Sequence, residues 1–192
     1  RVKSPNVVTV HDVGRLNDGR PYFVLDFADR GTLTARLVSS QLARPFTSQC
    51  LMPLVDAMAD GLDAIHQAGL VHRDIKPDNI LFQKTRRLGA VPATATTAAM
   101  ASNSASVLVA ADERVLVGDL GIAKDIVRDG CFPTAIGGTA LYLAPEQNIP
   151  SAEVTAAADI YSATALLWHV LTGKPPPMPD GLANHLPALP PA

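Results

Sequence analysis

The sequence predicts an α+β fold in which strands and helices occupy separate stretches of the chain. Residues Val7–Val13 and Tyr22–Phe27 are rich in β-branched and aromatic side chains, and the turn-forming sequence NDG at 17–19 lies between them. This arrangement predicts a β-hairpin. Further along, two stretches carry apolar residues at a spacing of about 3.6 residues, which predicts two helices.

The first predicted helix follows the turn into residue 47, and Gly69 is expected to stop it. Its N-cap is expected at Thr47 or Ser48. Because proline is tolerated only in the first turn of a helix, Pro53 places the expected start near Cys50. The apolar face of this helix comprises Leu51, Leu54, Val55, Met58, Leu62 and Ile65.

The remaining elements are shorter or lie later in the chain. Asn79–Phe82 and Arg114–Val117 are predicted as buried strands, and Asp159–Leu171 as the second helix. The alanine-, threonine- and serine-rich tract between the strands has no amphipathic period, which predicts a disordered insertion at about 84–106. Residues 106–119 fit either a hairpin that turns at 111–113 or a single strand with a frayed lead-in.

Composition excludes several classes of function. With 192 residues, 47% of them hydrophobic, the chain is globular, and its formal charge of −2 provides no electrostatic footprint for nucleic acid. Cys50 and Cys131 lie far apart without metal-ligand spacing, so free thiols are expected. No apolar run approaches the roughly 20 residues that span a bilayer, so no membrane contact is expected from this segment. The start at Arg1 suggests a piece of a longer protein.

The segment VHRDIKPDNILF at 71–82 combines charged and amide side chains between apolar residues. Phosphoryl transfer requires a carboxylate to orient the attacking hydroxyl, a cation near the transferred group and oxygen ligands for Mg²⁺. Asp74, Lys76 and Asn79 supply these groups within one loop. Asp119 supplies a second carboxylate after a predicted strand, and Gly121 permits a tight backbone path there.

Four motifs in order carry a family resemblance: HRDIKPDN at 72–79, DLG at 119–121, GGTALYLAPE at 137–146 and DIYSATALLWHVLTGKPPP at 159–177. They resemble the eukaryotic-type (Hanks-type) serine/threonine protein kinases, and the alanine- and proline-rich composition is similar to that of bacterial members. The resemblance implies a truncated two-lobe protein-kinase-like fold, with the last strands of the small lobe and most of a mainly helical large lobe. Residues 1–28 would be the small-lobe remnant and hinge, 29–177 the partial large lobe, and 178–192 a proline-rich tail or linker; a ligand for proline-binding modules is the alternative for the tail.

The resemblance also implies roles for the polar residues. Asp74 would be the catalytic base, Lys76 would neutralise the transferring phosphate, and Asn79 and Asp119 would hold Mg²⁺. Asp159 would brace the catalytic loop through backbone amides. His72 is expected to pack rather than to shuttle protons, and the other histidines are assigned to surface or core without partners: His11, His66, His169 and His185.

The cofactors implied are ATP and Mg²⁺, and the partners are nucleotide and protein substrates with serine or threonine. Leu25 would be the gatekeeper, the backbones of Asp26 and Ala28 would bond adenine, and Leu81 would form part of the pocket floor. For regulation and substrate binding, Arg73 would receive a phosphate from Thr134, and Thr139 would line the substrate site.

Two departures from the family pattern bear on function. Leu120 replaces the usual phenylalanine, and the glycine-rich phosphate loop with its ATP-positioning lysine has no counterpart, so both are expected upstream of Arg1. The implied activity is that of an ATP-dependent serine/threonine protein kinase in signalling, with the fragment inactive alone. The alternatives are a pseudokinase or scaffold module and a small-molecule phosphotransferase of related fold. By analogy the kinase domain is cytoplasmic, in a parent protein that such bacterial relatives often anchor to the membrane.

Overall fold

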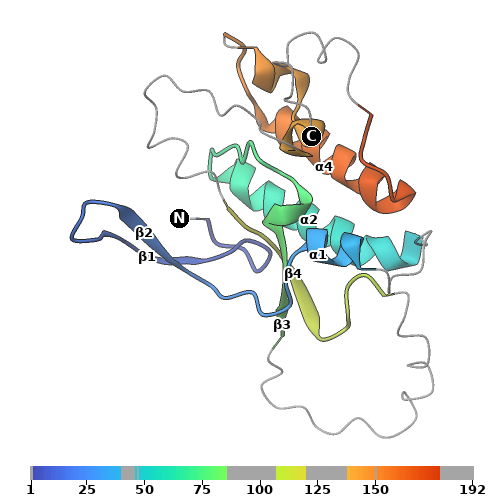
Figure 1. The fold of residues 1–192 in the computed structure, drawn as a ribbon, viewed down its shortest axis with the longest axis horizontal. Coiled ribbons are helices and arrows are strands. Elements are labelled where there is room, and N and C mark those ends of the chain that lie inside the picture. The colour runs from blue at the N-terminus through green and yellow to red at the C-terminus, as the bar shows by residue number, and fades with distance from the viewer. Residues whose placement is uncertain are drawn as a thin grey trace, which may run out of the picture.

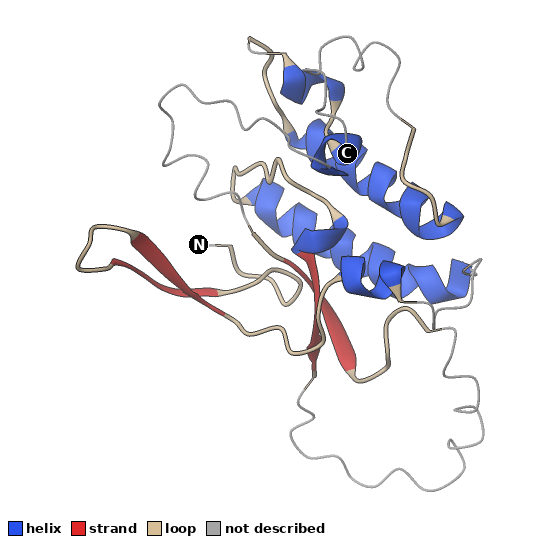
Figure 2. Ribbon diagram, viewed as in Figure 1, coloured by secondary structure: helices blue, strands red, loops and turns tan. Residues whose placement is uncertain are grey.

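The computed structural model describes residues 2–39, 46, 48–85, 107–119, 138–149 and 151–177. Its helices and strands fall into two layers joined by the first helix, with a hairpin extending to one side (Figures 1 and 2). The strands are β1 (Val10–Arg15), β2 (Pro21–Leu25), β3 (Ile80–Lys84) and β4 (Glu113–Val117). The helices are α1 (Leu33–Val38), α2 (Ser48–Gln67) and α4 (Ala156–Thr172), with 3₁₀ turns at Pro77–Asn79, Gly138–Tyr142 and Pro145–Asn148.

The predicted hairpin is confirmed, but its first strand lies later than expected. β1 pairs antiparallel with β2, and the connecting turn includes Gly19, whose φ of 86° favours glycine. Val7, predicted within the strand, instead forms a parallel bridge to Val117 of the other sheet. The strand boundary is therefore shifted because residues 6–8 exchange hydrogen bonds with β4: Val8 donates to Val117, and Val117 donates to Asn6.

The two predicted buried strands form the second sheet. β3 and β4 pair antiparallel from Ile80 opposite Val117 to Lys84 opposite Glu113. Residues 107–110 form no strand and residues 111–112 form a turn, so the single-strand alternative for this region is the one adopted. Asn79, predicted as the first strand residue, belongs to the preceding 3₁₀ turn. Residues 86–106 of the predicted insertion lie outside the described residues.

Helix α2 begins at Ser48, two residues before the expected start. Pro53 consequently lies in the second turn, where it removes one backbone donor, and it faces solvent. Buried side chains on the opposite face, Leu51, Leu54, Met58, Leu62 and Ile65, compensate for this loss. The helix ends before Gly69, whose φ of 73° fits the predicted stop.

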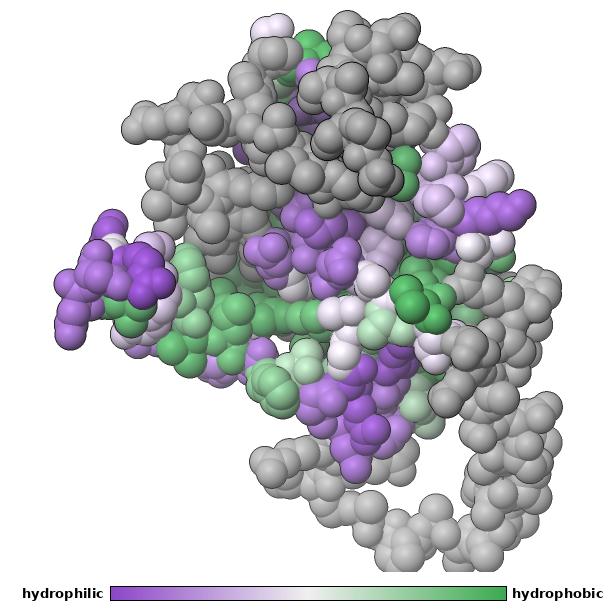
Figure 3. Space-filling view, in the orientation of Figure 1, coloured by the Kyte–Doolittle hydropathy of each residue, from purple (hydrophilic) through white to green (hydrophobic). Residues whose placement is uncertain are grey.

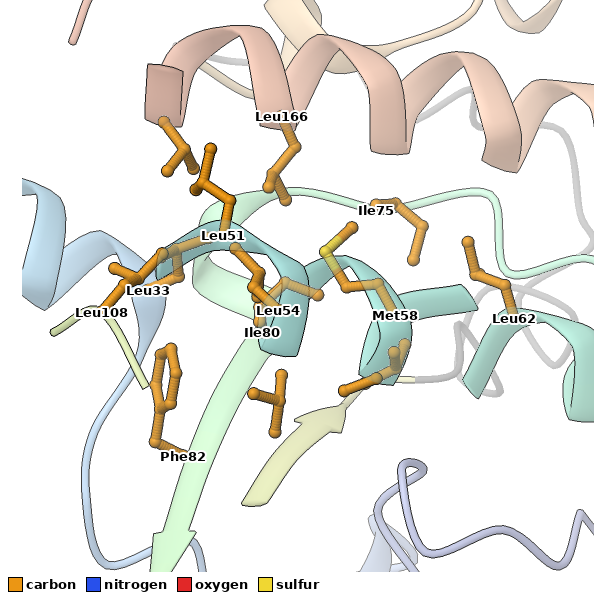
Figure 4. Packing of buried hydrophobic residues seen from close by; sticks show 14 of the residues in the cluster. Leu33, Leu51, Leu54, Met58, Leu62, Ile75, Ile80, Phe82, Leu108 and Leu166 are labelled. Carbon is orange, nitrogen blue, oxygen red and sulfur yellow. The ribbon is translucent and has the colours of Figure 1, made fainter. Parts of the chain in front are cut away.

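Helix α4 starts three residues before the predicted Asp159, because the hydroxyl of Thr155 accepts a hydrogen bond from Ala157 and caps it. Gly173 ends it in the left-handed conformation. Buried side chains from α2, α4 and β3 form one core, and Ile75 of the intervening loop projects into it (Figure 4). Elsewhere the surface is apolar: hydrophobic residues run from the hairpin toward the middle of the molecule (Figure 3), including Val13, Val24, Leu25 and Phe27.

Candidate active site

The loop between α2 and β3 carries the predicted catalytic residues, and alternate side chains of this loop face opposite environments. Ile75 is 1% exposed and belongs to the hydrophobic core. The neighbouring side chains, Asp74 and Lys76, meet in an ion pair with 3.0 Å between Nζ and Oδ2. Burial of the isoleucine therefore anchors the loop and leaves the two charged groups together on its polar side.

Asn79 completes a hydrogen-bonded group with these residues. Its Nδ2 donates to the backbone carbonyl of Asp74 at 2.7 Å and to Oδ2 of the same residue at 3.2 Å. Asp74 is 4% exposed and Asn79 is 7% exposed, so these bonds form in a shielded environment where they are stronger than in water. The three residues that the sequence analysis assigned to one loop are thus in direct contact.

Asp159 of α4 braces the loop as predicted. Its carboxylate is fully buried and accepts hydrogen bonds at 2.8 Å from the backbone N–H groups of both His72 and Arg73. A third bond comes from Nε2 of His66, also at 2.8 Å. The first α4 turn therefore holds the two residues immediately before Asp74.

The assignment of the other histidines to positions without partners was wrong for three of them. His66 binds Asp159, His169 contacts the hydroxyl of Tyr142 at 2.6 Å, and His11 pairs with Asp26 at 2.7 Å. Each partner lies at least 15 residues away in sequence, so no local pattern marks these pairs. His185 lies outside the described residues.

His72 connects the loop to the end of β4. Its Nε2 donates to the carbonyl of Gly118 at 2.8 Å, and its Nδ1 accepts from the backbone N–H of Asp74 at 3.3 Å. This arrangement requires the neutral ring, because Nδ1 must carry no proton. Burial is the main cause that lowers the pKa of His72, although nearby carboxylates oppose it. The structure therefore fits the predicted packing role.

Asp119 reaches the loop through the residue before it. Gly118 donates its N–H to the carbonyl of Asn79 at 2.8 Å, which places Asp119 next to the loop. A Cβ at Gly118 would lie 2.8 Å from Cδ1 of Leu81, so the absent side chain permits this close approach. Asp119 itself has a φ of 53°, whereas Gly121, the glycine that the sequence analysis singled out, lies outside the described residues.

The oxygen atoms in this region suit Mg²⁺. Asn79 uses its amide nitrogen toward Asp74, so its amide oxygen is the atom available to a metal ion, and Asp119 adds an exposed carboxylate. Hard cations prefer such carboxylate and amide oxygens. Within the described ranges no group of three or more histidine, cysteine or acidic side chains is placed to hold a metal. The donor set thus fits an ion that is shared with another ligand, such as phosphate.

The residues predicted to contact adenine lie where β2 leads into the following segment. Leu25 ends β2 and is 46% exposed. The N–H of Asp26 donates to the carbonyl of Thr9, so its carbonyl is the backbone group that remains for a ligand. Burial alone would raise the pKa of Asp26, but hydrogen bonds from His11 and Thr9 hold it below its ordinary value.

The segment continues past Ala28 to β3, which carries Leu81. The carbonyl of Phe27 accepts a hydrogen bond from Nε2 of Gln83 at 2.7 Å, and Thr32 forms a bridge with Leu81. Ala28 is partly buried between these two links. The structure therefore brings the segment 26–32 against β3 and places Ala28 and Leu81 in neighbouring elements.

The predicted regulatory and substrate residues are only partly described. Arg73 is exposed, Thr134 lies outside the described residues, and Thr139 is placed by its backbone in the Gly138–Tyr142 turn without its side chain. The sequence analysis overlooked Gln147, which follows the APE motif. Its Nε2 donates to the carbonyl of Arg73 at 2.9 Å, a contact across 74 residues that no sequence pattern signals.

Comparison with protein families matches residues 1–185 to the protein kinase domain. The chain belongs to this family. It is 33% identical over 195 residues to the serine/threonine-protein kinase PknF of Mycobacterium tuberculosis, covering 98% of this chain and 35% of that protein. It is 32% identical over 185 residues to Pkn1 of Myxococcus xanthus, covering 94% of this chain and 22% of that protein.

The fold agrees with this membership. The crystal structure of the M. tuberculosis PknI kinase domain is similar with a TM-score of 0.60 and 25% identity, covering 91% of this chain and 53% of that domain. The kinase chain is thus an α+β, protein-kinase-like fold that spans about half of the solved domain and about a third or less of the curated relatives. Among its described helices, none has the length and apolar character needed to cross a bilayer.

Proposed function

We propose that this chain contributes the catalytic loop of a serine/threonine protein kinase, which transfers the γ-phosphate of ATP to serine or threonine hydroxyls of protein substrates. The observation that carries the proposal is the shielded group of Asp74, Lys76 and Asn79, joined by hydrogen bonds and an ion pair. It supplies a carboxylate, a cation and an amide oxygen in one place, which phosphoryl transfer requires.

In the proposed reaction, Asp74 accepts the proton of the substrate hydroxyl as its oxygen bonds to the γ-phosphorus. The bond between the γ-phosphorus and the bridging oxygen of ADP breaks, and ADP leaves. The ammonium group of Lys76, 3.0 Å from Asp74, stands where it neutralises charge on the transferred group. Mg²⁺ bound by Asn79 and Asp119 would add electrostatic stabilisation of the phosphates.

Supporting parts follow the family residue by residue. The carbonyl of Asp26, the backbone of Ala28 and the side chains of Leu25 and Leu81 would contact the adenine ring. In the regulatory segment, Thr134 would carry a phosphate paired with Arg73, and Thr139 would line the peptide site; both threonines belong to the stretch between DLG and APE. We assign residues 1–28 to the small lobe and hinge and 29–177 to the large lobe.

The test compares the full-length wild-type protein with its Asp74→Asn variant. With ATP and Mg²⁺, the wild type should phosphorylate a serine peptide, and Asp74→Asn should lower turnover at least 10²-fold while nucleotide affinity changes little, because general-base catalysis contributes typically 10²–10⁴-fold. Asp63→Asn, the same chemical change on the exposed face of α2, is the matched control.

Three other results would contradict the proposal, each in a different way. Nucleotide binding without transfer by the wild type would indicate a pseudokinase. Transfer to a small molecule but not to peptides would indicate a small-molecule phosphotransferase. Unchanged turnover in Asp74→Asn would remove this residue from the role of base.

A further inference from the structure

We infer that Gln147 is a positioning residue that couples the peptide-binding segment to the catalytic loop. Both ends of its amide are engaged: Nε2 donates to the carbonyl of Arg73 at 2.9 Å, and Oε1 accepts from the backbone N–H of Ala144 at 3.1 Å. Gln147 therefore joins the 3₁₀ turn Pro145–Asn148 to a loop that lies 74 residues earlier in the chain.

The carbonyl that Gln147 binds belongs to the peptide group between Arg73 and Asp74. Arg73 has a φ of 64°, a conformation that is unfavourable for a residue with a side chain. Such conformations persist only where the surroundings determine them on several sides. Here Asp159 binds the N–H of Arg73 from α4, and Gln147 binds its carbonyl from the opposite direction in the chain.

Loss of the Gln147 bond leaves the peptide before Asp74 held only at its N-terminal side. Rotation of this peptide moves the Asp74 carboxylate relative to Lys76 and Asn79, the groups that it contacts at 3.0 and 3.2 Å. Because small misplacements of reacting groups are costly, turnover depends on this bond. The adenine contacts proposed for Asp26 and Leu81 lie on other elements, so ATP affinity does not.

This inference rests on the proposed kinase function and on the assignment of residues 138–149 to the peptide site. It adds that the segment contacting the substrate also fixes the backbone that carries the base. Movement of the Pro145–Asn148 turn therefore alters the placement of Asp74 without any contact between the two side chains.

The test uses three substitutions in the full-length protein that separate the two hydrogen bonds. Gln147→Glu keeps an acceptor for Ala144 but loses the donor, Gln147→Lys keeps a donor for Arg73 but loses the acceptor, and Gln147→Leu loses both. The same three substitutions at Gln67, whose amide donates to Asp63 on the exposed side of α2, control for charge and volume.

Turnover of a serine peptide should fall about tenfold in the Glu and Leu variants, the order expected for one hydrogen bond, with the KM for ATP within about twofold of wild type. The Lys variant should regain most of the loss. Hydrogen exchange of the peptide that covers residues 71–76 should accelerate in the Glu and Leu variants but not in the Gln67 controls.

Two results would overturn the inference in an active wild type: turnover within twofold of wild type in all Gln147 variants, or losses that the Gln67 controls reproduce. Unchanged exchange at 71–76 in Gln147→Glu would do the same. If Gln147→Leu fails to fold, Gln147→Glu decides, because it retains the bond within its own turn. A wild type that phosphorylates no peptide would instead overturn the proposed function, and the inference with it.

Discussion

Replacement of Asp159 tests whether the fold, rather than the loop itself, determines the geometry before Asp74. Asp159→Ala removes an acceptor that the backbone N–H groups of His72 and Arg73 both use at 2.8 Å in a fully buried position. Each buried donor left without a partner costs about 1–3 kcal/mol, so the variant should lose about 2–6 kcal/mol of unfolding free energy. Domains are stable by only about 5–15 kcal/mol, so this loss is severe.

Asp159→Asn should fall between wild type and Asp159→Ala, because its amide keeps one oxygen that can accept from one of the two N–H groups. The assay is urea unfolding of the full-length protein followed by circular dichroism, with Asp63→Asn on the exposed face of α2 as the control. Peptide phosphorylation is measured where each variant is still folded. If Asp159→Ala unfolds within about 0.5 kcal/mol of wild type, the range of ordinary surface substitutions, the bracing role is refuted.

Two further predictions concern buried charge. The lowered pKa of His72 means that the folded protein binds fewer protons than the unfolded chain, so stability should decline as the pH falls below about 6.5; urea midpoints at pH 7.5 and 5.5 should show this, and the non-titrating His72→Gln should flatten the dependence. Glu113→Gln should cost about 3–5 kcal/mol, because Arg36 pairs with it at 2.9 Å and would stay buried over Phe82. A double-mutant cycle with Arg36→Met that gives additive losses, or equal pH dependence in His72→Gln and wild type, would contradict them.

The sequence was sufficient to predict the groups that act within one short stretch of chain. Asp74, Lys76 and Asn79 lie within six residues, so the loop that contains them brings them together once Ile75 is buried. Periodicity likewise predicted α2 and α4, because a helix buries the residues that recur on one face. Their starts were misplaced by two or three residues, since the caps and the tolerance of Pro53 depend on local contacts that periodicity does not record.

The contacts that hold the loop in place could not be predicted in the same way. His66 and Asp159 are separated by 93 residues, and Gln147 and Arg73 by 74. Neither histidine nor glutamine carries a local pattern that names its partner. Val7 shows the same limit: its β-branched side chain fitted the hairpin, but hydrogen bonds from its neighbours to Val117 place it on the second sheet instead.

The loop before Asp74 has no regular structure of its own until the 3₁₀ turn at Pro77–Asn79, so its backbone groups must find partners elsewhere. They find them on three separate elements: Asp159 on α4, Gly118 after β4 and Gln147 beyond the APE motif. These elements come together only when the core formed by α2, α4 and the second sheet has packed. The geometry of the catalytic loop is therefore a property of the packed large lobe. A substitution far from Asp74 that loosens this packing acts on catalysis through the backbone of residues 72 and 73.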